Sequence, residues 1–249
     1  MSRGRRWAIF LPVVVTLLLA GVVGALIVVQ NQAQADRVAA ADTAGESFLS
    51  DVGMFRGDVA RQLREADAAD PAALRQVLQE AVADPPNLAD VPDDAAGESD
   101  VYAAAVDTEK TFLEPYARLG TQLRRAEISL TFIAAARAAL QVKASDYVGF
   151  GLLEDSAVVR SRLIPAFVAA RDSFAAVRVP KGQDALASTV RGAVQYVIDQ
   201  ATILADSIDA NRSFSFTYAD QFRTAAAAVD DYATTVGGDL TEAISAIAG

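Results

Sequence analysis

The chain has 249 residues, a formal net charge of −10, no cysteine and no histidine. Without these two residue types it lacks the commonest general base and the commonest metal ligand, which excludes Ser-His-Asp hydrolases, cysteine nucleophiles, HExxH zinc proteases and Glu-x-x-His di-iron bundles. The acidic excess argues against nucleic acid as a partner. We therefore expect no metal, no cofactor and no enzymatic activity.

An uncharged apolar run covers residues 7–29. As an α-helix it would rise about 34 Å, enough to cross a hydrocarbon core of about 30 Å and to contact membrane lipid. Arg3, Arg5 and Arg6 precede it, and the first acidic residue is Asp36. The positive-inside rule then predicts a cytoplasmic tail at residues 1–6 and an extracytoplasmic domain at 30–249, on a single-pass protein of the cytoplasmic membrane.

Two further features of this run bear on its role. Ala33-Gln34-Ala35 has the small-x-small form of a signal-peptide cleavage site, so a cleaved anchor stays an alternative, although the run exceeds the roughly 7–15 residues of a signal h-region. Small residues four apart favour close helix packing, through which two copies could pair. They are Ala20, Gly21, Gly24 and Ala25.

The chain after the run carries apolar residues in alternating steps of three and four, the 3.5-residue period of a helical bundle. The first stripe predicts a helix over 36–67 that continues the anchor, and it consists of Val38, Ala41, Gly45, Phe48, Val52, Phe55 and Val59. Asp70-Pro71 then predicts a new helix, because aspartate caps a helix and proline suits its first position.

An acidic segment at 85–99 follows and contains Asp90, Asp93, Asp94 and Glu98. It has no periodic apolar pattern and lacks the D-x-D-x-D-G order of a calcium loop, so we expect an exposed connection.

The second half predicts helices over 100–142, 154–177, 184–210 and 215–247. Pro115 predicts a kink or a helix start near Glu114, and Pro165 predicts another kink. We expect Ser213 or Ser215 to cap the last helix, and Gly237-Gly238 to bend or interrupt it. The stripe of the 100–142 segment is Phe112, Tyr116, Leu119, Leu123, Ala126, Leu130, Ile133, Arg137 and Leu140.

No stretch between turn signals is identified with the period of two that a strand requires. The predicted fold is therefore all-α: a single N-terminal transmembrane helix followed by an extracytoplasmic antiparallel bundle of four to six helices. Its core is expected to depend on Phe48, Phe55, Phe112, Phe167, Phe174 and Phe222.

The favoured function is that of a structural or interaction subunit at the outer face of the membrane, with an envelope or membrane protein as partner. The composition, rich in alanine, valine and arginine, is typical of a high-GC bacterium. Exposed aromatic residues would mark the interaction surface. The candidates are Tyr147 and Phe150, in a glycine-containing loop, and Phe214 and Phe216.

Two alternatives stay open. The layout resembles, in architecture, the sensing half of bacterial chemoreceptors and sensor kinases, so the first alternative is a small-ligand-binding or sensory module. Because guanidinium groups suit carboxylates and phosphates, its candidate anion anchors are Arg124, Arg125 and Arg137. Glu46-Ser47 resembles the catalytic Glu-Ser pair of lytic transglycosylases, but the Gly-Leu-Met-Gln type segment that should follow is missing.

Overall fold

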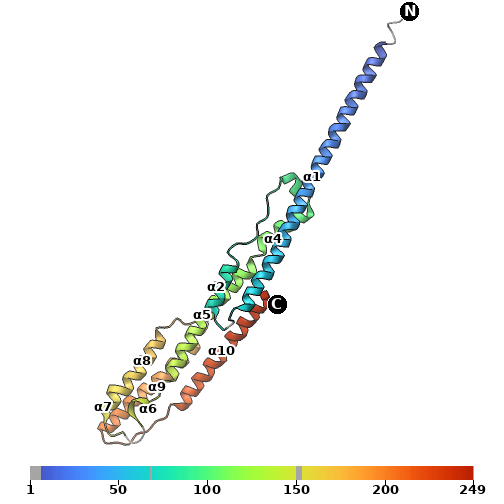
Figure 1. Cartoon of the computed structure of the whole chain (residues 1–249). Helices are drawn as coiled ribbons and strands as arrows, with labels where there is room; N and C mark the ends of the chain where they lie inside the picture. Colours follow the sequence, from blue (N-terminus) through green and yellow to red (C-terminus); the bar gives the residue numbers. More distant parts are fainter. Residues whose placement is uncertain (1–6, 68, 150–152, 249) are drawn as a thin grey trace, which may run out of the picture. The chain divides into compact units, whose positions relative to one another are not determined.

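The computed structural model describes residues 7–67, 69–149 and 153–248, and side chains within residues 32–247 of these ranges. Every regular element in the described residues is a helix and none is a strand, so the predicted all-α class is confirmed (Figure 1). Its elements are α1 (Trp7–Glu65), α2 (Pro71–Ala81), α3 (Asp93–Ala96), α4 (Asp100–Thr111), α5 (Glu114–Leu140), α6 (Ser145–Val148), α7 (Ser156–Val158), the π-helical turn η1 (Val159–Leu163), α8 (Ile164–Ala175), α9 (Asp184–Asp209) and α10 (Ala219–Ala248).

The predicted transmembrane segment, residues 7–29, forms the first part of α1. Its side chains lie outside the described residues, and so does the predicted packing surface of Ala20, Gly21, Gly24 and Ala25. Among the helices of the described part, none combines the length and the apolar character needed to cross a membrane.

The chain divides into two compact units. Unit 1 consists of Met1–Val59 and Val82–Pro115, and unit 2 consists of Ala60–Ala81 and Tyr116–Gly249.

Unit 1 is built on the apolar stripe of α1. Phe48 of this stripe meets Phe112 edge to face, with ring centroids 5.9 Å apart, and Phe55 meets the same ring at 5.9 Å. The predicted 3.5-residue seam is therefore confirmed here. The buried cluster contains Ala41, Phe48, Val52, Leu88, Ala95, Tyr102, Ala105 and Phe112.

The acidic segment of unit 1 is not a free connection. It contains α3, whose Ala95 is buried in the unit 1 core. Arg37 of α1 donates to Asp94 at 2.8 Å, and this hydrogen bond holds the pKa of the Asp94 carboxyl below its usual value. The Ser99 hydroxyl donates to Asp42 of α1 at 2.6 Å. Part of the acidic charge therefore holds the segment against α1.

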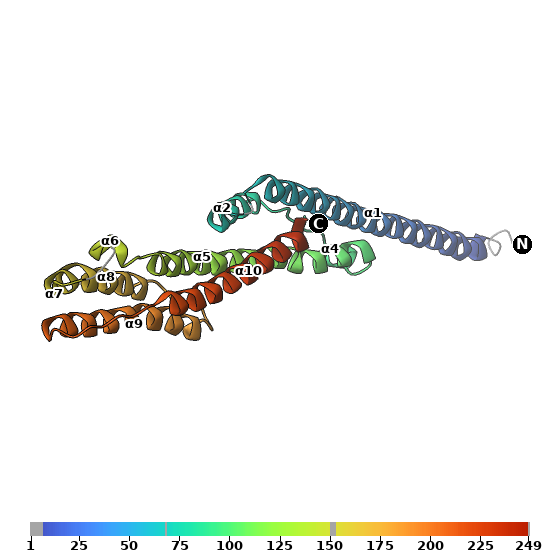
Figure 2. The ribbon, with the colours of Figure 1, turned by 90° about the horizontal axis from the view of Figure 1, so that it is seen from below.

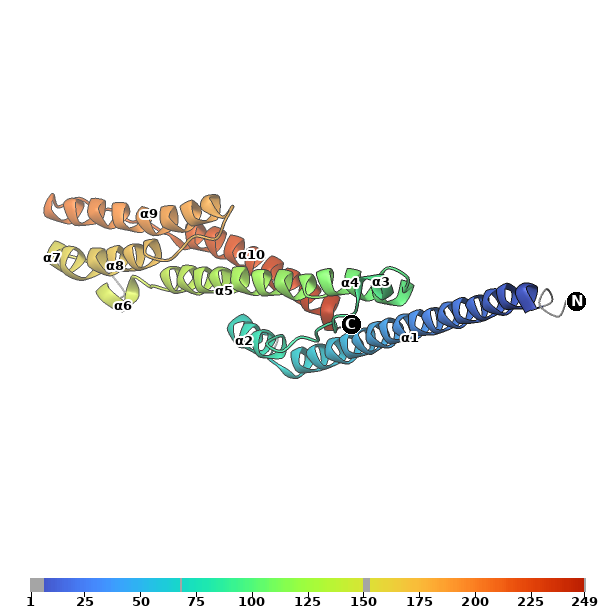
Figure 3. The same ribbon diagram turned by 90° about the horizontal axis from the view of Figure 1, so that it is seen from above.

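Unit 2 contains four long helical segments, α5, η1 with α8, α9 and α10, that alternate in direction. Figure 2 and Figure 3 show α8 and α9 side by side, and α9 also contacts α10. Phe132 of α5 lies fully buried against Phe174 of α8 and Tyr232 of α10, at centroid distances of 5.3 and 6.4 Å. The half-buried pair of Arg75 and Glu127, 2.6 Å apart, joins α2 to α5.

The buried row of α5 departs from the predicted stripe after Ala126. Positions 130, 137 and 140 were expected to be buried, but Ser129, Ala136 and Ala139 are buried in their place. Phe132 is buried beside Ile133. A straight α-helix has 3.6 residues per turn, so a strict 3.5-residue pattern drifts by about 20° per heptad. Arg137 therefore lies beside the buried row and not on it.

The prolines and glycines act differently from one another. Pro115 marks a helix start, because α4 ends at Thr111 and α5 begins at Glu114. Pro165 has no N–H to donate to the Ser161 carbonyl, and in an α-helical turn its ring would crowd that carbonyl. The wider π-helical turn η1 precedes Pro165, and in it the Ile164 N–H donates to the Val159 carbonyl. The expected interruption at Gly237-Gly238 is wrong, since α10 runs through both residues.

Candidate interaction surface

Four pieces of the chain meet at one end of unit 2: α6, the start of α7, the last turn of α9, and residues 210–218 that lead into α10. Two contacts show that they adjoin one another. The Ala144 N–H beside α6 donates to the Tyr218 hydroxyl at 2.9 Å, and Arg160 of η1 donates to Asp209 of α9 at 2.6 Å. We refer to this region as the α6/α7 end.

The last turn of α9 is closed by a left-handed residue. Asn211 has φ 52°, a conformation that costs most residues energy but that asparagine tolerates. The Asn211 N–H donates to the Ile208 carbonyl at 3.0 Å and the Arg212 N–H to the Ser207 carbonyl at 2.8 Å, which is the Schellman pattern. The chain is therefore turned out of the helix, and α10 begins at Ala219, four residues later than predicted. The predicted caps Ser213 and Ser215 lie outside it.

Residues 213–218 form an extended segment whose side chains alternate. Phe214, Phe216 and Tyr218 are partly buried, while the hydroxyl residues between them are exposed. The rings of Phe214 and Phe216 lie 6.3 Å apart and those of Phe216 and Tyr218 lie 6.4 Å apart. Two extended residues advance the chain by about 6.6 Å, so both spacings fit an extended backbone. This alternation with a period of two was not predicted from the sequence.

The aromatic row of Phe214, Phe216 and Tyr218 continues into the core of unit 2. Tyr218 meets Phe222 edge to face at 4.9 Å, and Phe167 of α8 lies 6.0 Å from Tyr218 and 6.2 Å from Phe222. Edge-to-face pairs of this kind add about 0.5–1.5 kcal/mol each beyond the area they bury. One face of the segment is therefore fixed to the bundle, and its hydroxyl face is left exposed.

The backbone of this segment forms no backbone hydrogen bond with the residues that the structure describes. Within the described part of the chain, no backbone N–H or carbonyl of residues 213–217 forms a backbone hydrogen bond. Five consecutive peptide groups in an extended conformation are a template for pairing with another extended chain. We call residues 213–217 the unpaired segment.

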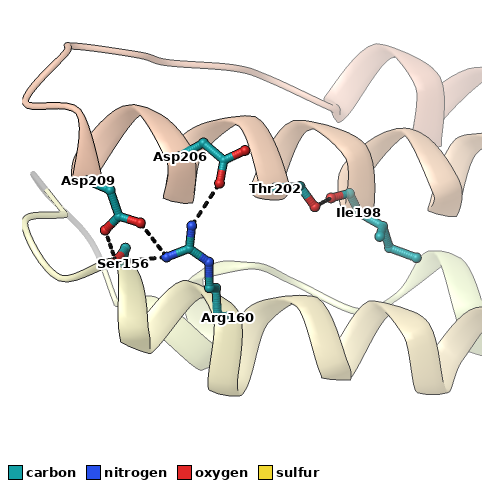
Figure 4. A network of polar contacts seen from close by, with 6 residues as sticks. All are labelled: Ser156, Arg160, Ile198, Thr202, Asp206 and Asp209. Atoms are coloured by element: carbon teal, nitrogen blue, oxygen red, sulfur yellow. Dashed lines mark hydrogen bonds and ion pairs between the residues drawn. The ribbon is translucent and has the colours of Figure 1, made fainter.

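A polar cluster joins α7 and η1 to α9 beside the unpaired segment (Figure 4). Arg160 donates to Asp209 at 2.6 Å, to Asp206 at 2.7 Å and to the Ser156 hydroxyl at 3.1 Å, and Ser156 donates to Asp209. The hydrogen bond from Ser156, followed by that from Arg160, lowers the pKa of Asp209. The bonds to Asp209 and Asp206 raise the pKa of Arg160. All three ionised groups therefore fasten this end of unit 2.

The predicted interaction residues lie partly together. Tyr147 is 38% exposed on α6, and Phe214 and Phe216 belong to the aromatic row at the same end. Phe150 lies outside the described residues. The sequence places Tyr218 on the apolar stripe of the last helix, and it is this residue that joins the row to the core. Arg160 was not predicted as part of a site. A sequence signal for the polar cluster exists in Asp206 and Asp209, which lie one turn apart on α9.

The three predicted anion anchors are not brought together. Arg137 donates through Nε and Nη2 to Asp230 of α10, at 3.2 and 2.7 Å. Arg124 and Arg125 are exposed on α5, where neighbouring residues point about 100° apart. Glu46, of the Glu-Ser pair, is exposed on α1. The described residues also contain no group of three acidic side chains placed to hold a metal ion.

The chain matches no protein-family model, no curated protein and no solved structure.

Proposed function

We propose that this protein is a single-pass, membrane-anchored helical bundle that serves as a structural or interaction subunit at the outer face of the cytoplasmic membrane. One observation carries the proposal: α1 is a single helix from Trp7 to Glu65. The apolar run 7–29 and the stripe that builds the unit 1 core therefore belong to one helix, with no linker between them. At 1.5 Å per residue, residues 30–59 extend about 45 Å beyond the run.

The α6/α7 end supports the interaction part of the proposal. It offers an exposed tyrosine, a row of partly buried aromatic rings and five residues whose backbone groups have no backbone partner among the described residues. Aromatic side chains with an exposed edge are enriched at protein interfaces, because they bury a large area at little cost in conformational entropy. The alternative of a small-ligand sensor has less support, since Asp230 already neutralises Arg137.

The anchor is tested by extracting membranes at alkaline pH. We expect the wild-type protein to stay in the membrane pellet, and a Leu17→Arg/Val22→Arg variant to be released or lost from it, because each central arginine opposes insertion by about 2.5–3.5 kcal/mol. The matched control is Leu17→Ala/Val22→Ala. Intact-mass analysis shows whether the first 35 residues remain. Wild-type protein in the supernatant, or a mature chain beginning at Asp36, would contradict the anchor.

The interaction part is tested by photo-crosslinking in membranes. A photoreactive residue at Tyr147, which is exposed at the α6/α7 end, should give a discrete protein adduct on irradiation. The same residue at Thr131, exposed on α5, serves as the control. Equal adducts at both positions, or none at Tyr147, would count against an interface at the α6/α7 end.

A further inference from the structure

The sequence of the unpaired segment is palindromic in side-chain type. Its sequence, Ser213-Phe214-Ser215-Phe216-Thr217, places hydroxyl residues at both ends and at the centre, with phenylalanines between them. An antiparallel pair of identical strands related by a two-fold axis places each residue opposite its mirror position. A palindromic order of side-chain types suits such a pair, because each hydroxyl residue then lies opposite a hydroxyl residue and each phenylalanine opposite a phenylalanine.

We propose that the unpaired segment pairs, antiparallel, with the same segment of a second copy of this chain, with the two-fold axis passing through Ser215. This inference deepens the proposed function, on which it rests, by naming a partner. In the pair Ser215 faces Ser215, Phe214 faces Phe216, and Ser213 faces Thr217. Hydroxyl pairs and aromatic pairs across antiparallel strands each contribute about 0.2–1 kcal/mol.

The charges around the segment are compatible with this arrangement. Residues 213–217 carry no charge, so no like charges meet across the axis. Arg212, the exposed flanking cation, would stand opposite Tyr218 of the partner copy, where its guanidinium complements the negative face of the ring. The two-fold axis repeats the contact between Arg212 and Tyr218, so both ends of the pair are electrostatically complementary.

The anchor of the proposed function explains how so short a contact could hold. A pair of two short strands is at best marginally stable by itself in water. Two copies held in one membrane meet at a raised effective concentration, which strengthens a weak contact without adding any new one. Each copy also presents its segment already extended, because the aromatic row is packed against Tyr218, Phe222 and Phe167.

The chain has no native cysteine, so a single introduced thiol reports the pairing. Opposed residues in an antiparallel pair have Cβ atoms about 4.5–5.5 Å apart, which small adjustments bring within disulfide reach. Position 213 faces 217, so two copies of position 213 lie about 13 Å apart along the strands. Under mild oxidation in membranes, full-length Ser215→Cys should shift to twice its mass, whereas Ser213→Cys should stay monomeric. Coexpressed Ser213→Cys and Thr217→Cys chains should cross-link to each other.

Two controls make the test decisive. Ser173→Cys, exposed on α8 of the same unit, reports random collisions, and far-UV circular dichroism verifies that each variant is folded. If Ser215→Cys dimerises no more than Ser173→Cys, or if Ser213→Cys dimerises as readily as Ser215→Cys, the antiparallel pairing is overturned. Alkaline extraction of the same Ser215→Cys membranes shows separately whether the anchor holds, so failure of the pairing is distinguished from failure of the proposed function.

Discussion

Gly45 of α1 packs directly against the backbone of Val101 in α4. A Cβ placed on Gly45 would lie 3.0 Å from both the carbonyl carbon and the carbonyl oxygen of Val101, and 3.1 Å from the Cα of Tyr102. These distances are shorter than most real Cβ contacts, and the neighbouring atoms are backbone atoms, so α4 would have to shift to admit a side chain here. The glycine, which weakens α1 locally, is therefore what lets the two helices of unit 1 approach.

Replacing Gly45 by alanine should destabilise unit 1 by about 1–3 kcal/mol, because the added methyl group forces α1 and α4 apart. The matched control is Gly53→Ala on the same helix, where a Cβ would meet nothing within 4 Å. That change should stabilise the helix by up to about 1 kcal/mol through its better helix propensity. Thermal unfolding followed by circular dichroism measures both, and equal melting temperatures for the two variants would refute the close packing.

The carboxylate of Asp209 should contribute to stability in a pH-dependent way. Its pKa is lowered in the folded protein, so its contribution is present above the unfolded pKa of about 3.8 and is lost as the pH falls through the folded pKa. The free energy of unfolding of the Asp209→Asn variant should therefore depend less on pH below about pH 4 than that of the wild type. Superimposable acid titrations of Asp209→Asn and wild type would contradict this assignment.

Phe132 should be among the most costly side chains to truncate in unit 2. It is fully buried between α8 and α10, so Phe132→Ala should lower the free energy of unfolding by about 3–5 kcal/mol. Ile203→Ala on α9, where the side chain is 44% exposed, should change it by less than about 0.5 kcal/mol. Urea denaturation compares the two, and similar midpoints would mean that the core is not centred on Phe132.

Asn211 offers a test of how α9 ends. Asn211→Ala should cost about 1–2 kcal/mol, because alanine is strained at φ 52°, whereas Asn211→Gly should be neutral or stabilising. The melting temperatures of the pair give the comparison. If alanine proved as stable as glycine, the left-handed turn that aims the unpaired segment would not be needed.

Much of the fold follows from the spacing of apolar residues. In the α1 stripe from Ala41 to Val59, Phe55 is partly buried and the other members are buried, as predicted, since a repeated 3-4 pattern is specific to helices. The helix start at Asp70-Pro71 also follows from local chemistry, and Asp70 caps the N–H groups of Ala72 and Ala73.

Other features depend on tertiary packing or on short patterns. In α5 the 3.5-residue count drifts from the true helical period, which misplaced Arg137 and missed Phe132. The alternation from Ser213 to Tyr218 is too short to stand out between two helical stripes. The two carboxylates that bind Arg160 lie more than forty residues away in sequence, so their meeting depends on how η1 packs against α9.

Whether the bundle faces outward from a membrane anchor is measured by labelling single cysteines in spheroplasts with a membrane-impermeant maleimide. We expect Ser173→Cys to be labelled in intact spheroplasts, and Ser2→Cys to be labelled only after the membrane is broken. Labelling of Ser173→Cys only after lysis would contradict this orientation.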